Sequence, residues 1–550
     1  MKNIEKYKQK RPGNMQLELE ARCSGTRPFR QIQGEGVHPE TFTASARQDH
    51  PVPITFDPSA FPDDPFDYTQ LAVEGLPHAM GQPAVVAIIG AGASGLLAGL
   101  ELLRAGHYPV IFEASERVGG RLFTVREFDD PLVYAEMGSM RVPPVHRTLM
   151  HYLNLFGIKT RKFPNPNNIK TCYYVNGKKE FGSPDQQVPW VAHLYGKWDA
   201  AIRPFSQRLQ EVWHDPEQRT ARWKEITSRY KEMTFRDFLV EQQWSTEEIE
   251  LFSTVGFGVG GYGPLYPISF TEILRINVCR WDDEQMEIVG GNDKLARGFL
   301  EHRVPVEEDE LHSLKDLGLV NTRTPVTRID RDDAAGQLIL TTKQGDTFIA
   351  DAVIITAQPR AIQMEMEIRH DLLDHRQWQA IYNTHFMSSG KIFLETETAF
   401  WKKPGSEITT TISDLPIRGT YLFDFEDTDS GLICASYTWE DDSRKWHAST
   451  IEERAEKAID MLEEIYGKDS IRPHVVSAYG FSWEEMPGYR GAFKQFYAGQ
   501  QHYYEALARP SNNIWFAGDA VSYAGGWIEG ALQAGLRAAS EIAEKFKAIH

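Results

Sequence analysis

A glycine-rich turn between a buried strand and a helix constrains this chain more than any other feature of its sequence. Residues 84–89 (AVVAII) form an uninterrupted apolar run, and residues 94–105 are rich in leucine and alanine. The turn between them, residues 90–95, reads GAGASG, and an apolar run resumes at residues 110–112. The order strand, glycine turn, helix, strand predicts a βαβ unit of a parallel sheet.

Each residue of this unit has a physical role in holding a dinucleotide. Gly90 permits the tight turn, Gly92 lets the backbone approach a pyrophosphate, and Gly95 allows the helix to pack close to the strand. The helix N-terminus at Ser94 supplies N–H groups and partial positive charge. Glu113, at the end of the second strand, would accept hydrogen bonds from a ribose diol. A glycine turn that serves packing alone is the alternative.

Two distant segments indicate which dinucleotide is bound. Residues 117–121 (RVGGR) follow the second strand directly, and Arg121 offers a fixed cation for a pyrophosphate. They resemble the RxGGR signature of the flavin amine oxidase family. Residues 515–520 resemble that family's closing motif, in which an aspartate, here Asp519, holds the ribityl or pyrophosphate portion. The resemblance implies FAD as the cofactor, with Val326 beside the adenine.

The segment at residues 136–143 (EMGSMRVP) narrows the family to amino-acid substrates. It resembles the Gly-x-Met-Arg-x-Pro segment of L-amino-acid oxidases, including bacterial and fungal L-lysine, L-arginine and L-phenylalanine oxidases, and of the lysine and tryptophan 2-monooxygenases. The resemblance implies that Arg141 grips the substrate carboxylate and that Gly138 lies against the flavin. A planar guanidinium is the best fork for a carboxylate. Alternatively, Arg141 pairs with an internal acid.

Further resemblances place more residues at the substrate. Residues 435–439 are similar to the SYxW strand of these oxidases, and period two puts Tyr437 and Trp439 on one face of that strand. Lys391 matches the family's strand lysine, which binds a water near flavin N5. For Trp439 the alternative is core packing, and for Lys391 it is an exposed position on a strand.

The segment before the last helix, and the presumed side-chain pocket, complete the predicted site. By resemblance, Gly526 and Ile528 face the flavin pyrimidine edge while Trp527 stacks beside the substrate. By resemblance, lysine-specific relatives carry an acid at the position of Leu265 and a small residue at the position of Trp281. These differences weaken the prediction of a lysine-specific enzyme. The pocket could suit arginine, aromatic or large apolar side chains.

These motifs predict an α/β fold with an FAD-binding, Rossmann-like domain of the GR2 flavoprotein type, a mixed-sheet substrate domain and an inserted helical subdomain. We expect four parts: an irregular N-terminal arm at residues 1–83, the FAD-binding domain at residues 84–145, 285–365 and 481–550, the substrate domain at residues 146–185 and 366–480, and the helical subdomain at residues 186–284.

Composition limits the partners of the chain. Its 550 residues, 41% of them hydrophobic, carry a formal net charge of -18, which argues against binding to nucleic acid or anionic membranes. The four cysteines show no CxxC spacing, so they predict buried thiols and no metal site. No signal peptide or membrane span is visible, and a cytoplasmic protein, most commonly a homodimer or higher homo-oligomer, is the expectation.

The reaction implied by the resemblance is oxidative deamination of an L-amino acid. Hydride transfer from Cα to FAD and reoxidation by oxygen would give a 2-oxo acid, ammonia and hydrogen peroxide. Two alternatives stay open at this point. One is an L-amino-acid 2-monooxygenase, which would yield an amide and CO2. The other is a flavin-free binding protein on the same fold, as in the GDP-dissociation inhibitors.

Overall fold

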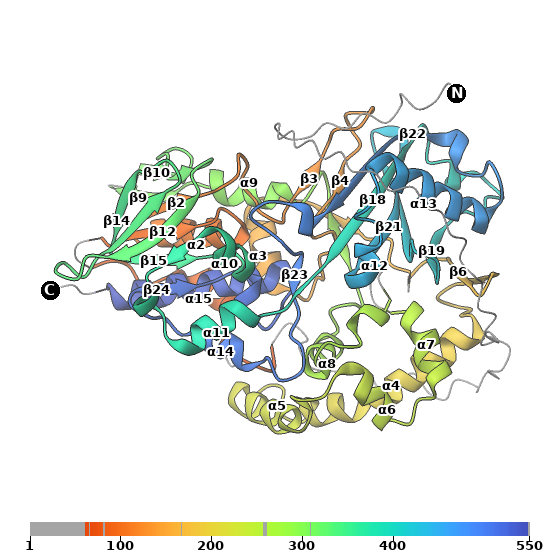
Figure 1. Cartoon of the computed structure of the whole chain (residues 1–550), viewed down its shortest axis with the longest axis horizontal. Helices are drawn as coiled ribbons and strands as arrows, with labels where there is room; N and C mark the ends of the chain where they lie inside the picture. Colours follow the sequence, from red (N-terminus) through yellow and green to blue (C-terminus); the bar gives the residue numbers. More distant parts are fainter. Residues whose placement is uncertain are drawn as a thin grey trace, which may run out of the picture.

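The computed structural model divides the chain into a parallel-sheet region, a mixed-sheet region and a helical region (Figure 1). In Figure 1 the parallel sheet lies at the left, the mixed sheet at the upper right, and the helices of the third region below it. The structure describes residues 61–64, 66–80, 83–166, 168–256, 261–307 and 310–547.

A five-stranded parallel sheet forms the centre of the first region. Its order is β11-β2-β1-β15-β24, with every neighbouring pair parallel. The chain enters the sheet with β1 and completes it with a strand more than 400 positions later: β1 (Val85–Ile89), β2 (Tyr108–Phe112), β11 (Val320–Asn321), β15 (Ala352–Ile355) and β24 (Ile514–Phe516). The predicted βαβ unit is confirmed.

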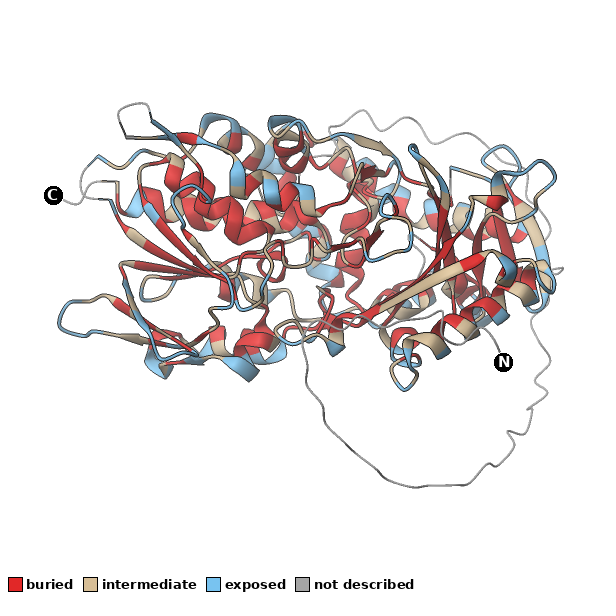
Figure 2. Cartoon of the chain, turned by 90° about the horizontal axis from the view of Figure 1, so that it is seen from above, coloured by how far each residue is buried: buried red, intermediate tan, exposed pale blue. Residues whose placement is uncertain are grey.

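Both faces of this sheet are covered, which explains its continuous apolar strands. On one face Val86 and Ile88 pack with α2 (Ala93–Arg104) and the last helix, α15 (Ile528–Lys545). On the other, Ala87 and Ile89 pack against a second layer of four strands. That layer comprises β12 (Val326–Arg331), β13 (Leu338–Thr342), β14 (Thr347–Ala350) and β16 (Glu367–Ile368). Figure 2 shows the buried residues concentrated where these layers meet.

Two strands of this layer form a hairpin, in which β13 and β14 pair antiparallel around a turn at Gly345, whose φ is +91°. Glycine adopts this left-handed conformation without steric cost.

A seven-stranded mixed sheet forms the second region. Its strands run in the order β22 (Val475–Ser482), β18 (Ser389–Thr396), β21 (Thr428–Trp439), β20 (Gly419–Phe425), β19 (Thr410–Ser413), β6 (Thr171–Val175) and β7 (Lys178–Gly182). The β19–β6 pair is parallel and the other pairs are antiparallel. One face packs against α13 (Ile451–Tyr466), and the opposite face, which includes Phe393 and Cys434, packs towards the first region.

The third region is helical and held together by aromatic side chains. It contains α4 (Pro189–Gln210), α5 (Pro216–Tyr230), α6 (Phe235–Glu241), α7 (Thr246–Thr254) and α8 (Phe270–Val278). Phe238 and Phe270 stack with ring centroids 3.7 Å apart, and Trp198 packs edge-on against Phe235. The α/β class with a Rossmann-like sheet, a mixed sheet and a helical insertion is therefore as predicted.

The smaller elements connect these regions. They are α1 (Tyr68–Glu74), β3 (Thr124–Val125), β4 (Ala135–Glu136), α3 (Arg147–Leu155), β5 (Thr160–Lys162), β8 (Met286–Ile288), α9 (Asp293–Glu301), β9 (Val304–Glu307), β10 (Glu310–His312), α10 (Pro359–Glu365), α11 (His375–Asn383), β17 (Phe386–Met387), α12 (Glu440–Arg444), β23 (Phe493–Lys494) and α14 (His502–Ala508).

One part of the N-terminal arm is helical, so the prediction of an irregular arm is wrong for α1. The helix starts because the carboxylate of Asp67 accepts hydrogen bonds from the backbone N–H groups of Thr69 and Gln70. Tyr68 and Ala72 are the buried residues of this helix. The arm before residue 61 lies outside the described residues.

Cys172, Cys279 and Cys434 are buried thiols outside any disulfide, as predicted, and Cys23 lies outside the described residues. Within the part of the chain that the structure describes, no helix has both the length and the apolar content needed to cross a membrane.

Candidate functional site

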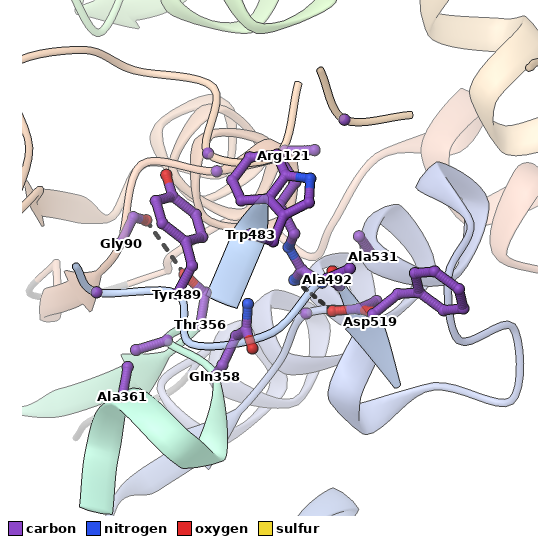
Figure 3. Close-up of a pocket in the computed structure, with 18 of the residues that line it drawn as sticks. Gly90, Arg121, Thr356, Gln358, Ala361, Trp483, Tyr489, Ala492, Asp519 and Ala531 are labelled. Carbon is purple, nitrogen blue, oxygen red and sulfur yellow. Dashed lines mark hydrogen bonds and ion pairs between the residues drawn. The ribbon is translucent and has the colours of Figure 1, made fainter. Parts of the chain in front are cut away.

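A cavity of about 970 Å³ opens where the strands of the parallel sheet end. Its walls include the residues that follow β1, β2 and β15 at their carboxyl ends, where open α/β sheets bind ligands. It continues to the mixed sheet, where Lys391 and Tyr437 line it. Figure 3 shows part of the wall, with side chains from both ends of the chain pointing into one space.

The glycine turn forms one end of this cavity. Gly90 has a φ of +108°, which favours glycine, and a Cβ on Gly120 would lie 3.1 Å from the Cα of Gly92. Gly90 and Gly92 line the cavity. Gly95 is not part of the cavity wall that the described residues form. A Cβ there would lie 2.0 Å from the carbonyl oxygen of Gly90. Its role in the structure is the close packing of helix on turn.

Ser94 supplies the clearest sign that an anionic group fits here. Its hydroxyl lies in the first turn of α2, is buried, lines the cavity and has no hydrogen-bond partner among the described residues. Buried hydroxyls nearly always have a partner. An unpartnered hydroxyl beside helix N-terminal N–H groups is therefore suited to a phosphate oxygen.

Glu113 lines the cavity and also holds the turn together. Its carboxylate accepts hydrogen bonds from the backbone N–H of Ala91 at 2.8 Å and from the backbone N–H of Ser115 at 2.8 Å. An ionised carboxylate has about four acceptor positions, so it can also accept from a ribose diol.

Arg121 and Asp519 form an ion pair across the cavity, and Figure 3 draws them pointing towards each other. Arg121 also donates to the carbonyl oxygen of Ala492 at 2.8 Å. Burial alone would raise the pKa of Asp519, but the Arg121 guanidinium outweighs it and lowers that pKa. Asp519 is therefore held as a carboxylate beside the cavity.

The other predicted cofactor contacts also reach the cavity. Val326, at the start of β12, Ile528, at the start of α15, and Gly138 all line it. A Cβ on Gly138 would lie 1.7 Å from the carbonyl oxygen of Arg121, so this position admits only glycine without a backbone shift.

The structure adds lining residues that the sequence interpretation missed. Trp483 and Tyr489 pack with ring centroids 4.8 Å apart, and the Trp483 indole donates to the carbonyl oxygen of Met137 at 3.2 Å. Thr356 and Gln358 follow β15 and also line the cavity (Figure 3). Their position at the carboxyl end of a parallel strand is a signal that could have identified them; no motif marked Trp483 or Tyr489.

Arg141 lines the cavity with a carboxylate close by. Its guanidinium is 3.5 Å from Asp282, with side-chain exposures of 9% and 16%, and 5.9 Å from the ring centroid of Trp527. Burial acts to lower the pKa of Arg141, but Tyr421, Asp282 and Tyr437 together raise it. The alternative of an internal acid partner thus holds in part, since Arg141 is both paired and part of the cavity wall.

Asp282 separates Arg141 from a second, more polar cavity of about 750 Å³. Burial raises the pKa of Asp282 to about 7, although Arg141 acts to lower it. Gln285 donates to the Asp282 carboxylate at 2.7 Å. Asp282 therefore changes charge near neutral pH beside the guanidinium of Arg141.

Lys391 is buried, with 3% exposure, so it is not an exposed strand lysine. Its ammonium donates to the carbonyl oxygens of Glu136 at 2.8 Å and Gly138 at 2.6 Å, and lies 4.6 Å from the ring centroid of Tyr437. Burial lowers its pKa. Lys391 thus ties the strand of the mixed sheet to the segment that carries Arg141.

The predicted substrate contacts divide into lining residues and one supporting residue. Leu265, Trp439, Trp527 and Gly526 line the cavity, together with Tyr437. Trp281 is buried and does not appear among the described lining residues; its ring lies 6.0 Å from that of Trp527. It supports Trp527 from behind.

A glycine-rich turn, an acidic strand end and an Arg–Asp pair surround one cavity, an arrangement typical of dinucleotide-binding proteins. Residues 93–543 match the family model described as flavin containing amine oxidoreductase. The chain belongs to that family and is a flavin-dependent oxidoreductase; the flavin-free alternative is not retained.

Several proteins and structures are similar to this chain. A tryptophan 2-monooxygenase of Pantoea agglomerans pv. gypsophilae is 31% identical, covering 84% of this chain and 89% of its own length. A Bacillus subtilis (strain 168) protein with the provisional name L-amino-acid oxidase YobN is 29% identical, covering 86% and 98%. A putrescine-bound putrescine oxidase structure has a TM-score of 0.68 and 21% identity, covering 84% and 99%, and shows the same fold.

The unpartnered hydroxyl of Ser94 generates a prediction. Ser94→Ala should weaken FAD binding about tenfold, or about 1.4 kcal/mol, because it removes a hydrogen bond to a phosphate and breaks none within the protein. Titration of the flavin-free protein with FAD measures the change. Ser436→Ala is the matched control, because that hydroxyl is also buried and unpartnered but lies in β21 and outside the described cavity lining. Equal affinities for the two variants would contradict the assignment.

Proposed function

We propose that this protein catalyses FAD-dependent oxidative deamination of L-amino acids with large side chains to 2-oxo acids, ammonia and hydrogen peroxide. The observation that carries the proposal is Arg141, a largely buried guanidinium in the wall of a flavin-type cavity, 3.5 Å from Asp282. An amine substrate has no need of such a cation, whereas an amino acid brings a carboxylate to it.

Arg141 and Tyr437 would hold the substrate carboxylate. The guanidinium supplies a planar fork of donors, and Tyr437, on β21 of the mixed sheet, lies close to it. The carboxylate would take the place of Asp282 as the partner of Arg141. Fixing one end of the substrate in this way orients its Cα hydrogen, and orientation is a major source of rate enhancement.

The chemistry of electron transfer would come from bound FAD, which accepts a hydride from the substrate Cα. The protein would contribute position and charge. Arg121 and Asp519 would hold the cofactor, and the N-terminus of α15 at Ile528 would place N–H groups near its reduced, anionic form. Lys391 would keep the backbone of Gly138 in place through its hydrogen bond.

The lining beside Arg141 supports a large side chain. Leu265, Ile276, Trp439 and Trp527 present apolar surface at this end of the cavity. Asp282 lies at the edge of that surface. Arginine, aromatic and large apolar side chains are all compatible with these walls, as the sequence interpretation had it.

A second candidate is an L-amino-acid 2-monooxygenase, favoured by the 31% identity to a tryptophan 2-monooxygenase. Both reactions require the same carboxylate contact and the same hydride transfer. They differ in products, because the monooxygenase yields an amide and CO2 instead of a 2-oxo acid, ammonia and hydrogen peroxide.

Anaerobic mixing with a panel of amino acids tests the proposal. We expect L-amino acids with large side chains to bleach the flavin absorbance and their D-enantiomers to leave it unchanged. After oxygen is admitted, peroxide and ammonia indicate the oxidase, and an amide indicates the monooxygenase. Bleaching by simple amines and by no L-amino acid would overturn the proposal.

Replacement of Arg141 tests the residue on which the proposal rests. Arg141→Ala should lower kcat/KM by at least about a hundredfold, because it removes charge-assisted hydrogen bonds of about 1.5–3 kcal/mol each. Arg141→Lys keeps the charge without the planar fork, so its kcat/KM should fall between those of Arg141→Ala and the wild type. Steady-state kinetics with the best substrate measures both. Unchanged kinetics would exclude Arg141 from the substrate site.

Asp282 predicts a pH dependence of carboxylate binding. Because its pKa is raised to about 7, Asp282 is ionised above that pH and competes with a carboxylate for Arg141. The Kd of benzoate, a probe that stays ionised throughout, should therefore rise between pH 6 and 8, by at most about tenfold per pH unit. Spectral titration of the bound flavin measures it.

Matched variants separate Asp282 from other groups near Arg141, including Tyr421, Tyr437 and Lys391. Asp282→Asn should bind benzoate more tightly above pH 7 and with little pH dependence. Asp283→Asn should retain the pH dependence with its midpoint moved to lower pH, because Asp283 is exposed and pairs with Arg280 but also acts to raise the pKa of Asp282. A wild-type profile in Asp282→Asn would show that another group titrates.

A further inference from the structure

A chain of charged side chains, all buried apart from the partly exposed Arg121, connects the N-terminal arm to the wall of the flavin cavity. Its members alternate between negative and positive charge, and each contacts the next. In order of contact they are Asp63, Arg275, Glu272, Lys494, Asp519 and Arg121. We call this set the charge relay. It begins on residues 61–64, which form no helix or strand, and ends at the cavity that holds the cofactor.

The half of the relay nearest the arm consists of direct ion pairs. Arg275, on α8, binds Asp63 through two nitrogens, and the Nη2–Oδ1 distance is 2.9 Å. Nη1 of Arg275 is 2.7 Å from Oε1 of Glu272. The other oxygen of Glu272 is 3.2 Å from Nζ of Lys494. Glu272 is therefore shared between two cations.

Lys494 joins this half to the cofactor site. Its backbone N–H donates to Oδ2 of Asp519 at 3.2 Å, while Oδ1 of Asp519 pairs with Arg121. The carbonyl oxygen of Lys494 lies 2.4 Å from the position of a Cβ on Gly525. A displacement of Lys494 is thus transmitted both to Asp519 and to the loop that precedes Trp527.

Burial makes the balance of the relay important. The side-chain exposures of Asp63, Arg275, Glu272, Lys494 and Asp519 are 7%, 3%, 3%, 0% and 5%. Three cations and three anions leave no net charge. Removing one member leaves an uncompensated charge in the interior, where the remaining members must move to find a partner.

We propose that Asp63, on the N-terminal arm, is a positioning residue for the flavin site. Without its carboxylate, Arg275 retains only Glu272, and the hold of Glu272 on Lys494 weakens. The other carboxylate that acts on the Lys494 ammonium is Asp519. Lys494 then competes with Arg121 for Asp519, and the cavity loses the fixed Arg–Asp pair that meets the cofactor.

The arm is docked well enough to serve this role. The Trp223 indole donates to Asp63 at 2.5 Å, and Arg219 donates to the carbonyl oxygen of Phe61 at 3.2 Å. The Phe61 ring lies 5.3 Å from that of Trp281, the residue that supports Trp527. The proposed role of the relay concerns the flavin site alone, so it does not depend on the proposed amino-acid substrate.

Titration of the flavin-free full-length protein with FAD tests the proposal. Asp63→Asn should weaken FAD binding by at least about tenfold, because it unbalances the relay. Asp64→Asn is the matched control: the same change at the next residue, whose carboxylate accepts from the Tyr68 hydroxyl at 2.8 Å and touches no relay member. It should bind FAD as the wild type does. Wild-type affinity in Asp63→Asn would overturn the proposal.

A charge-balanced double variant separates positioning from a loss of stability. Asp63→Asn combined with Arg275→Gln removes one anion and its cation, which leaves Glu272 to pair with Lys494 alone. FAD affinity should return to within about threefold of the wild type, because the effects of substitutions at two contacting residues are not additive. If the arm merely stabilises the fold, the double variant binds FAD no better than the single one, and the proposal is wrong. Where Asp63→Asn alone does not fold, the double variant is compared with the wild type: FAD affinity within about threefold supports the proposal, and weaker binding overturns it.

Discussion

The ion pair between Arg121 and Asp519 is the interaction on which the arrangement of the site depends. It joins segments separated by 398 positions, one after β2 and the other after β24, across a single cavity. Because Asp519 is buried, its charge is stable only beside the guanidinium and the N–H of Lys494. The parallel sheet brings the two segments to the same edge, and the pair then joins two walls of the cavity.

The rest of the cavity follows the same rule, since its buried charges are paired within the protein. Arg141 faces Asp282, and the Lys391 ammonium is satisfied by the carbonyl oxygens of Glu136 and Gly138. When the proposed carboxylate substrate binds, Arg141 therefore exchanges Asp282 for the substrate, because its charge is already paired in the free protein. The proposed effect of Asp63 extends this dependence to the N-terminal arm.

Sequence reasoning succeeded where the signal is local. The apolar run of β1, the glycine turn and α2 follow from hydrophobic periodicity and the steric freedom of glycine, and the motif residues Arg121 and Asp519 do line one cavity. It failed for α1, which depends on the Asp67 cap and on burial of Tyr68 and Ala72. It placed Trp281 in the substrate pocket, whereas the structure puts it one layer behind.

By itself the sequence determined the fold class and indicated a dinucleotide cofactor, because the succession of strand, glycine turn and helix and the acidic strand end are encoded within short segments. Only the tertiary structure decided how the charges are partnered. The pairing of Arg141 with Asp282, the placing of Trp483 and Tyr489 in the cavity wall, and the contact of Asp63 with Arg275 join residues far apart in the chain. Such contacts are set by packing and by the cost of burying an unpaired charge, and no local pattern records them.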